Sequence, residues 1–270
     1  MSTITIPHIS AMKGGEKIVV LSLYTSAMAE LVDDACDIIL VGDSLGMVLY
    51  GFPDTPKVTL AMMIEHGRAV ARHSRHALVV IDMPYGTVEH DKETALKNCQ
   101  KVMAETGAAA VKIEGGQKMA PTIAYITRHN IPVMGHVGLL PQQAPLLGGF
   151  KAQGLDKDDW QAIIDDATAI ANAGAFSIVI ECVAAPLAEK ITAAVAVPTI
   201  GIGASPICDG QVLVADDMIG LTYQGRKRPR FVRPFADAGT LVKQAARHYR
   251  QAVRDGSFPN DKEIYQPKDK

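Results

Sequence analysis

Seven residues with chemically useful side chains end or follow short apolar runs of this sequence. They comprise four carboxylates, a lysine, a histidine and a hydroxyl, namely Asp43, Ser44, Asp82, Lys112, Glu114, His136 and Glu181. Carboxylates brought close together repel one another, and a bound divalent cation usually offsets this repulsion. Because hard oxygen donors suit Mg²⁺ better than zinc, we expect Asp43, Asp82 and Glu114 to form a magnesium site, with Mn²⁺ as a substitute.

The remaining polar residues extend this prediction from binding to chemistry. Lys112 would supply a fixed positive charge beside the metal. Glu181 lies in an apolar run, so it would be a desolvated carboxylate that is available as a base. A metal, a cation and a base together can form and stabilise the enolate of a small oxo acid. The residues thus predict metal-assisted enolisation, and they leave the substrate open.

Each of these residues also has a purely structural interpretation. The two aspartates could form turns or cap helices. Lys112 and Glu114 are two positions apart, so they share one face of a strand and could form an ion pair. His136 could be a hydrogen-bonded core histidine, and Glu181 could pair with a distant arginine. The functional interpretation is favoured because independent structural roles would scatter polar residues over both ends of the strands.

Eight short apolar runs must position these side chains. They are rich in Val and Ile and span residues 18–24, 37–44, 78–85, 109–116, 132–139, 177–184, 198–205 and 211–218. Nearly continuous Val/Ile runs are typical of parallel strands buried on both faces. Helical segments separate most of the runs. Those at 92–107 and 156–174 end in Gly107 and Gly174, and Asp156 is suited to cap the second.

Strands that alternate with helices predict an α/β fold, a single closed (β/α)₈ TIM-type barrel with its chemistry at the C-terminal ends of the strands. The interval after the seventh run is too short for a helix. An open doubly wound sheet is the alternative, but no G-x-G-x-x-G motif opens a helix after the first run. We expect a catalytic barrel domain at 1–256 and a polar C-terminal tail at 257–270.

Composition narrows the class of protein further. The 270 residues are 48% hydrophobic and carry 27 basic against 29 acidic side chains, a net charge of −2. With this charge balance the protein has no overall positive potential that would attract nucleic acid or an anionic membrane, so neither is an expected partner. The first residues lack a secretory signal, no stretch is apolar enough to span a bilayer, and the four cysteines lie far apart. A cytoplasmic location is therefore expected.

Several motifs of the sequence resemble those of one enzyme family. They are VGDSLGM (41–47), VKIEGG (111–116), GHVGLLPQ (135–142), GGFKAQG (148–154), IECV (180–183), and GIGA with CDGQVLV (201–214). In this order they are similar to ketopantoate hydroxymethyltransferase, also called 3-methyl-2-oxobutanoate hydroxymethyltransferase. The resemblance implies transfer of a hydroxymethyl group from 5,10-methylenetetrahydrofolate to 3-methyl-2-oxobutanoate. The product would be 2-dehydropantoate, on the pantothenate and coenzyme A route.

The resemblance also implies roles for the polar residues. Asp43, Asp82 and Glu114 match the family's ligands for one Mg²⁺ per subunit, and Glu181 matches its proton acceptor. The residues that match its keto-acid site are Asp43, Ser44, Asp82, Lys112 and His136. The chain departs from the family pattern at Thr25 and Ser205, where aspartate and glycine are usual. Because family members are commonly decamers, a homo-oligomer is expected.

Three other kinds of protein stay open. A metal-dependent oxo-acid C–C lyase or mutase of the same barrel type would usually need a cysteine loop such as C-G-H, which is absent. A Schiff-base aldolase would use Lys112, although the neighbouring Glu114 favours the protonated lysine. A non-catalytic keto-acid sensor would keep the metal and Lys112 and would have no use for Glu181.

One basic run, RKRPRFVR (226–233), has no counterpart elsewhere in the sequence. Its ordinary interpretation is a solvated surface loop. The functional hypothesis is that its basic residues Arg226, Lys227, Arg228 and Arg230 meet the anionic glutamate tail of folate.

Overall fold

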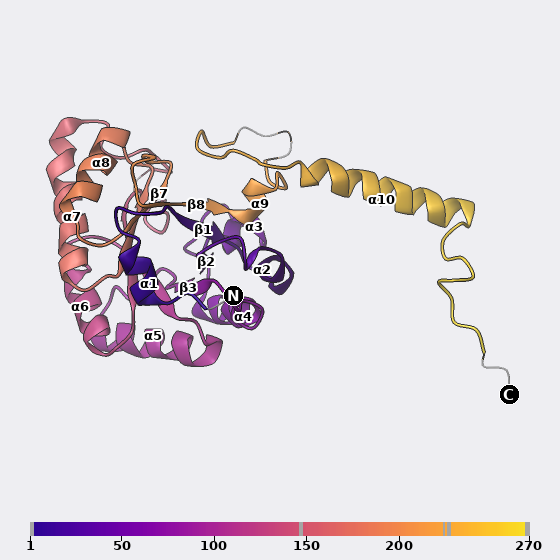
Figure 1. Ribbon diagram of the computed structural model, residues 1–270, viewed down its shortest axis with the longest axis horizontal. Helices are drawn as coiled ribbons and strands as arrows, with labels where there is room; N and C mark the ends of the chain where they lie inside the picture. Colours follow the sequence, from indigo (N-terminus) through magenta and orange to yellow (C-terminus); the bar gives the residue numbers. More distant parts are fainter. Residues whose placement is uncertain (1–2, 146–147, 224, 226–227, 268–270) are drawn as a thin grey trace. The chain divides into compact units, whose positions relative to one another are not determined.

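Eight parallel strands close into a barrel in the computed structural model, which describes residues 3–145, 148–223, 225 and 228–267 (Figure 1). The strands are β1 (Ile18–Ser22), β2 (Ile38–Val41), β3 (Leu78–Asp82), β4 (Ala110–Glu114), β5 (Val133–Gly138), β6 (Ser177–Glu181), β7 (Thr199–Ile202) and β8 (Gly210–Val214). Each strand pairs with its neighbours in sequence, and β1 also pairs with β8. The predicted (β/α)₈ TIM-type barrel is confirmed.

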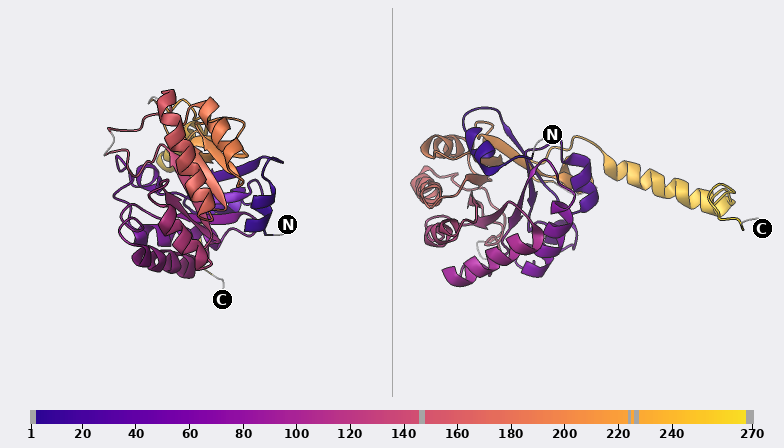
Figure 2. Two further views of the ribbon diagram at one scale, coloured as in Figure 1. Left: turned by 90° about the vertical axis from the view of Figure 1, so that its left-hand side faces the viewer. Right: turned by 60° about the horizontal axis from the view of Figure 1, so that its bottom comes forward.

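Helices follow most of the strands and pack on the outside of the barrel (Figure 1; Figure 2). They are α2 (Ser26–Val32), α3 (Leu45–Val48), α4 (Leu60–Ala71), α5 (Lys92–Thr106), α6 (Ala120–Arg128), α7 (Trp160–Asn172) and α8 (Ala185–Ala194), with a 3₁₀ turn, η1 (Lys157–Asp159), before α7. Another helix, α1 (Ile6–Ala11), precedes β1. Within the described chain no helix separates β7 from β8, in agreement with the short interval that the sequence shows there.

Local signals define the ends of the two helices that the sequence analysis placed. The predicted segment 92–107 is α5, which ends at Gly107 with φ 74°. The predicted segment 156–174 contains η1 and α7. Asp156 caps its start by accepting a hydrogen bond from the N–H of Asp158, and Gly174 follows its end with φ 96°. Both helices are confirmed because glycine tolerates the left-handed backbone that stops a helix.

The eighth apolar run differs from its prediction. Only its first part belongs to β8, and residues Ala215–Met218 form a short helix, α9. Asp216 and Asp217 lie in the first turn of α9. Acidic residues are favourable at a helix N-terminus, so these two aspartates are better suited to α9 than to a longer strand.

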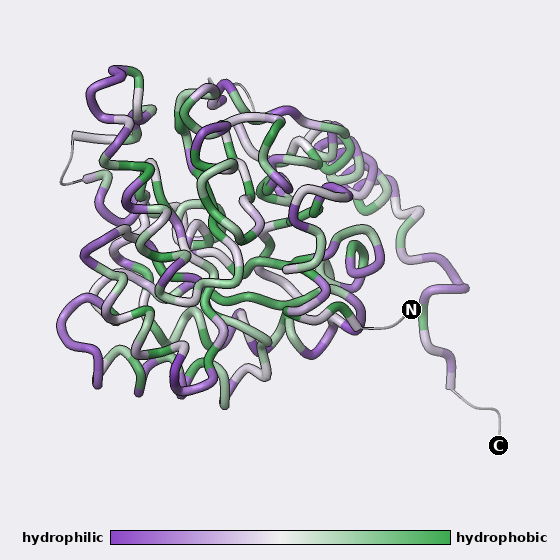
Figure 3. The backbone as a smooth tube through the Cα atoms, turned by 60° about the vertical axis from the view of Figure 1, so that its left-hand side comes forward, coloured by the Kyte–Doolittle hydropathy of each residue, from purple (hydrophilic) through white to green (hydrophobic). Residues whose placement is uncertain are grey.

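Side chains of alternate strand residues fill the N-terminal part of the barrel. This core contains Ile18, Val20, Ile38, Leu40, Leu78, Val80, Ala110, Met134, Phe176, Val179, Ile200 and Val212, together with Ile4 and Ile9 from the N-terminal segment. Ile9 of α1 is fully buried against this cluster, so α1 closes that end of the barrel. Figure 3 shows the hydrophobic residues running along the central strands.

The same alternation carries polar residues into the other end of the barrel. Because strand side chains alternate with a period of two, the inward position after Val80 on β3 is Asp82. On β5 the inward position after Met134 is His136. The apolar core and the polar residues are therefore successive layers of one barrel interior.

A second compact unit follows the barrel. Contacts within the chain divide it into Met1–Ala215 and Asp216–Lys270. The second unit contains α10 (Ala238–Asp255), which is capped by Asp237 and ends at Gly256 with φ 75°. The domain boundary expected between residues 256 and 257 stays a prediction. None of the helices in the described residues combines the length and apolar character that crossing a membrane requires.

Candidate active site

Strand register brings the predicted charged residues together at the C-terminal end of the barrel. Asp82, the last residue of β3, is the pairing partner of Lys112 on β4. Glu114, the last residue of β4, is likewise the partner of His136 on β5. All four residues are buried, so their charges interact with little water between them. The same end of the barrel carries the other three predicted residues, Asp43, Ser44 and Glu181.

Lys112 is the cation at the centre of this cluster. Its Nζ atom lies 2.6 Å from Asp82 Oδ1 and 3.9 Å from Glu114 Oε1. Burial alone would lower the pKa of Lys112, but the neighbouring carboxylates, that of Asp82 foremost, outweigh burial and hold the pKa above its ordinary value. The side chain therefore stays charged, which disfavours imine formation because an imine forms from the neutral amine. The ion pair with Glu114 considered above exists, and the contact with Asp82 is shorter.

His136 lies between two carboxylates. Its Nδ1 atom is 3.4 Å from Glu114 Oε1, and its Nε2 atom is 3.3 Å from Glu181 Oε2. Burial and the charge of Lys112 lower the pKa of His136, but the two carboxylates raise it to about 9. Nδ1 also lies 3.2 Å from Lys112 Nζ, so it accepts from the ammonium when the ring is neutral and donates to Glu114 when it is charged. Among the described residues, the partner of Glu181 is thus this histidine and not an arginine.

The turn after β2 contributes Asp43 and Ser44. The backbone N–H of Asp43 donates to Asp82 Oδ2 at 3.1 Å, which ties the turn to β3. Two residues to which the sequence analysis gave no role also contact this turn. Gln142 Nε2 donates to Asp43 Oδ2 at 2.9 Å, and the hydroxyls of Tyr24 and Ser44 are 2.7 Å apart. Gln142 ends the GHVGLLPQ motif and Tyr24 ends the first apolar run, but only the folded chain shows what they contact.

Gly42 allows the turn to approach the polar cluster. A Cβ atom at this position would lie 2.9 Å from both Ser22 Oγ and Ser44 Oγ, and 3.4 Å from Asp82 Oδ2. Real Cβ atoms essentially never come so near to two oxygen atoms. A larger residue would push both serine hydroxyls aside, so glycine is favoured where β2 delivers Asp43 and Ser44 to the site.

The acidic residues have the chemistry of a magnesium site. Burial raises the pKa of Asp43 well above its ordinary value, and the charges of Asp82 and Glu114 raise it further. A bound divalent cation would relieve this repulsion. Asp82 Oδ1 and Glu114 Oε1 are buried, and the nearest charged groups among the described residues are the Lys112 ammonium and the His136 ring.

The side chains of Asp43, Asp82 and Glu114 do not converge on one point. In the described part of the chain, no three acidic, histidine or cysteine side chains converge closely enough to hold a metal ion as they stand. Lys112 Nζ instead lies 2.6 Å from Asp82 Oδ1. The three side chains offer only hard oxygen donors, so the donor set fits Mg²⁺.

The two departures from the family pattern have structural partners. Thr25 caps α2, because its Oγ1 atom accepts a hydrogen bond from the N–H of Met28 at 3.3 Å. Ser205 is buried and donates to Glu189 Oε1 at 3.1 Å. Neither residue contacts the charged cluster through the hydrogen bonds of the described chain, so the ligand candidates are unaffected by these departures.

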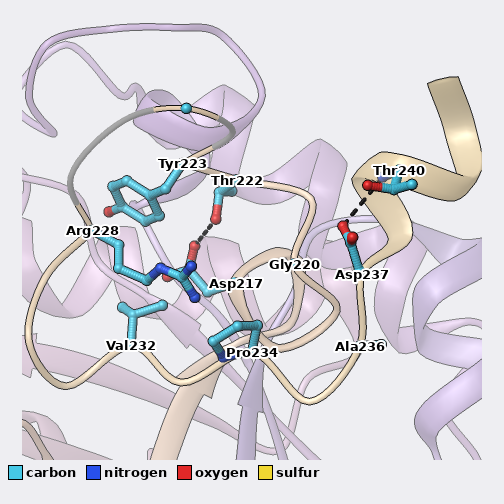
Figure 4. A pocket seen from close by; sticks show the side chains of 11 residues that line it. Asp217, Gly220, Thr222, Tyr223, Arg228, Val232, Pro234, Ala236, Asp237 and Thr240 are labelled. Carbon is cyan, nitrogen blue, oxygen red and sulfur yellow. Dashed lines mark hydrogen bonds between the residues drawn. The ribbon is translucent and has the colours of Figure 1, made fainter.

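A pocket of about 400 Å³ lies within the second unit (Figure 4). Its lining includes Arg228 and the carboxylates of Asp217 and Asp237, and Thr222 donates a hydrogen bond to Asp217. Because the described lining holds one cation against two carboxylates, it does not favour an anion. Arg226 and Lys227 lie outside the described residues, and contact between the basic run and a folate tail stays a prediction.

The fold and the buried charges define a (β/α)₈-barrel enzyme whose polar centre lies at the C-terminal ends of its strands. A family model described as ketopantoate hydroxymethyltransferase matches residues 3–261. The chain belongs to this family, and it is a transferase of pantothenate biosynthesis. Membership favours the transferase over the lyase, the aldolase and the sensor that the sequence left open.

Curated relatives match the chain over nearly its whole length. The 3-methyl-2-oxobutanoate hydroxymethyltransferase of Sphingopyxis alaskensis is 51% identical over 265 residues, which are 98% of this chain and 91% of the relative. The protein of the same name from Caulobacter vibrioides is 53% identical over 262 residues, with 97% and 94% covered. Among solved structures, phosphonopyruvate hydrolase has a TM-score of 0.60 at 16% identity, over 98% of this chain and 93% of that one. That likeness concerns the fold alone.

Proposed function

We propose that this chain transfers a hydroxymethyl group from 5,10-methylenetetrahydrofolate to 3-methyl-2-oxobutanoate at the C-terminal mouth of its barrel, giving 2-dehydropantoate. The observation that carries the proposal is the buried cluster of Lys112, His136 and the carboxylates, with Glu181 at its edge. Asp43, Asp82 and Glu114 would hold Mg²⁺, while Ser44, Lys112 and His136, together with the two aspartates, would bind the keto acid. When bound, Mg²⁺ supplies Lewis-acid polarisation of the substrate's keto oxygen.

Glu181 is proposed as the base that removes the C3 proton of the keto acid. Its side chain is 15% exposed, whereas that of Glu114 is 2% exposed, so Glu181 is the carboxylate that a substrate entering the mouth can reach. His136 Nε2, 3.3 Å from Glu181 Oε2, orients this carboxylate. Glu114 and Lys112 hold the other side of the imidazole ring in place.

Lys112 is proposed to stabilise the negative charge that develops on the substrate oxygen. It stays protonated in this buried cluster, and a fixed charge in a site of low dielectric acts strongly on an enolate. C3 of the enolate then attacks the methylene carbon of the folate as one of its two C–N bonds breaks, and water displaces the second folate nitrogen to give the hydroxymethyl group. The proton that Glu181 removed and one proton of the water end on the two nitrogen atoms of the tetrahydrofolate that leaves. Holding the two substrates in reacting geometry also contributes to the rate.

Proton NMR in D₂O tests the first half of this mechanism. With Mg²⁺ present, the purified protein should exchange the C3 proton of 3-methyl-2-oxobutanoate for deuterium, first alone and then with tetrahydrofolate added. Glu181→Gln should abolish the exchange, because the amide is no base, and EDTA should do so in the unmodified protein. Glu16→Gln, which changes an exposed carboxylate ahead of β1, is the matched control and should leave the exchange unaltered. Absence of exchange in both conditions would refute the assignment.

We also propose that the chain forms a homo-oligomer, a decamer by resemblance to its family, and that it functions in the cytoplasm. All four cysteines are free, which is the usual state in a reducing compartment. Sedimentation velocity would measure the assembly. A monomer at micromolar concentration would refute the first part, and recovery of the protein in a secreted fraction would refute the second.

A further inference from the structure

Gln142 contacts two of the three carboxylates proposed to hold Mg²⁺. It lies in the turn after β5, and it is 3% exposed. Its backbone N–H donates to Glu114 Oε2 at 3.2 Å. Its side-chain Nε2 donates to Asp43 Oδ2 at 2.9 Å and to the backbone oxygen of Met83 at 3.0 Å. One residue thus connects the turn after β2, the end of β3 and the end of β4.

These contacts determine which way the amide of Gln142 points. A glutamine amide has two N–H donors, and both are used here, one toward Asp43 and one toward Met83. If the amide were turned over, its oxygen would face the carboxylate of Asp43 and the carbonyl of Met83, which are both acceptors. The donating orientation is therefore the only one that satisfies the three groups.

The neutral amide has a second property that a cation would lack. It directs Asp43 through a hydrogen bond, but it leaves the negative charge of the carboxylate in place. A lysine at this position would hold Asp43 as firmly and would cancel part of the charge that attracts a divalent cation. Lys112 already provides such a cation at 2.6 Å from Asp82.

We propose that Gln142 is a positioning residue that orients Asp43 and Glu114 for the binding of a divalent cation. The inference rests on the proposed function, because that proposal makes both carboxylates metal ligands. Gln142 acts through these carboxylates and is not itself a ligand. Groups that orient metal ligands in this way typically change metal affinity 10- to 100-fold when they are removed.

The test measures Mn²⁺ binding to the metal-free, full-length protein, with no substrate present. Mn²⁺ is a suitable probe because it takes the same oxygen ligands as Mg²⁺ and its free concentration is measured by electron paramagnetic resonance. Gln142→Met keeps the length of the side chain and the backbone N–H but removes both amide donors. It should raise the Kd for Mn²⁺ roughly 10- to 100-fold. Gln142→Asn, whose amide is too short to reach both acceptors, should give a smaller loss and serves if the methionine variant does not fold.

Gln143→Met is the matched control. Gln143 is the adjacent residue, and its side chain has no hydrogen-bond partner among the described residues. The control should leave the Kd for Mn²⁺ unchanged. Thermal melting of the metal-free proteins separates the two possible effects, because a merely structural role would lower the melting temperature and leave the Kd of the folded fraction unchanged.

The outcomes distinguish this inference from the function on which it rests. Weaker Mn²⁺ binding by Gln142→Met, with Gln143→Met unchanged, supports it. Equal binding by the unmodified protein and Gln142→Met overturns the positioning role and leaves the proposed function standing. If the unmodified protein binds no Mn²⁺, the metal assignment within the proposed function fails, and the role of Gln142 fails with it. An equal loss in Gln142→Met and Gln143→Met also overturns the inference.

Discussion

Replacing Lys112 by methionine should strongly destabilise the metal-free protein. Methionine fills much of the same space, but it leaves Asp82 and Glu114 without the ammonium group that lies 2.6 Å and 3.9 Å from them. Lys112 and Asp82 are only 4% exposed, so water cannot replace the lost charge. Breaking a buried pair by removing one partner costs about 3–5 kcal/mol. For a chain of this size each kcal/mol lowers the melting temperature by about 2–4 °C, so the loss should be about 6–20 °C.

Two further measurements distinguish loss of charge from loss of packing. Mg²⁺ should raise the melting temperature of Lys112→Met more than that of the unmodified protein, because the variant has more uncompensated negative charge. Mild acid should also restore part of the lost stability, since protonation of the carboxylates removes their repulsion. Calorimetry and urea unfolding at several pH values would measure both effects.

Lys101→Met is the control for this prediction. Lys101 is 56% exposed and lies 4.0 Å from Glu105, and an exposed pair of this kind contributes only about 0.2–1 kcal/mol. A loss in Lys112→Met no larger than that in Lys101→Met would refute the reasoning. It would mean that water or neighbouring side chains compensate the carboxylates, so that the cluster is less isolated from solvent than its burial indicates.

Two other substitutions test separate parts of the structure. Asp33 accepts hydrogen bonds from Ser74 Oγ and from three successive backbone N–H groups; burial alone would raise its pKa, but these bonds lower it below the ordinary value. The stabilisation by the Asp33 carboxylate should therefore be complete above the pKa of Asp33 in the unfolded chain, and it should be lost as the pH falls through the lower pKa in the folded protein. At neutral pH the unmodified protein should exceed Asp33→Asn in free energy of unfolding by about 1 kcal/mol. Urea unfolding should show this difference shrinking in acid. A pH-independent difference would contradict this. Tyr24→Phe removes the hydroxyl that contacts Ser44. If Ser44 binds the keto acid, the variant should have a severalfold higher KM for it with little change in kcat. An unchanged KM would argue against a substrate-binding role for Ser44.

The barrel was predictable because its strands carry a local signal. Runs of Val and Ile that are buried on both faces differ from the amphipathic pattern of the surrounding helices. Seven of the eight runs contain a whole strand, and the eighth contains all of β8 except Gly210. The period of two also placed Lys112 and Glu114 on one face, and both are buried in the barrel interior. The error at the end of the eighth run arose because short apolar segments do not by themselves distinguish a strand from a helical turn.

The partners within the site could not be predicted in the same way. Gln142 and Asp43 are 99 positions apart, and Tyr24 and Ser44 are 20 apart. No periodicity relates such positions, because their contacts depend on how loops of different strands meet at the mouth. His136 and Glu181 lie on neighbouring strands, but His136 was not expected to be the partner of Glu181 because the sequence does not show the register of the two strands. Proximity at one end of the barrel was predictable, but hydrogen-bond connectivity was not.

Because β1 pairs with β8, the barrel closes only late in the folding of a newly synthesised chain. During synthesis β1 emerges long before β8, and Lys13 and Asp209, which form a salt bridge just ahead of these strands, are 196 positions apart. Until β8 is complete, the partial sheet has two open edges whose N–H and C=O groups can pair with another chain. A newly made chain is therefore most exposed to aggregation just before its last strand is added, and that strand removes both open edges in a single step.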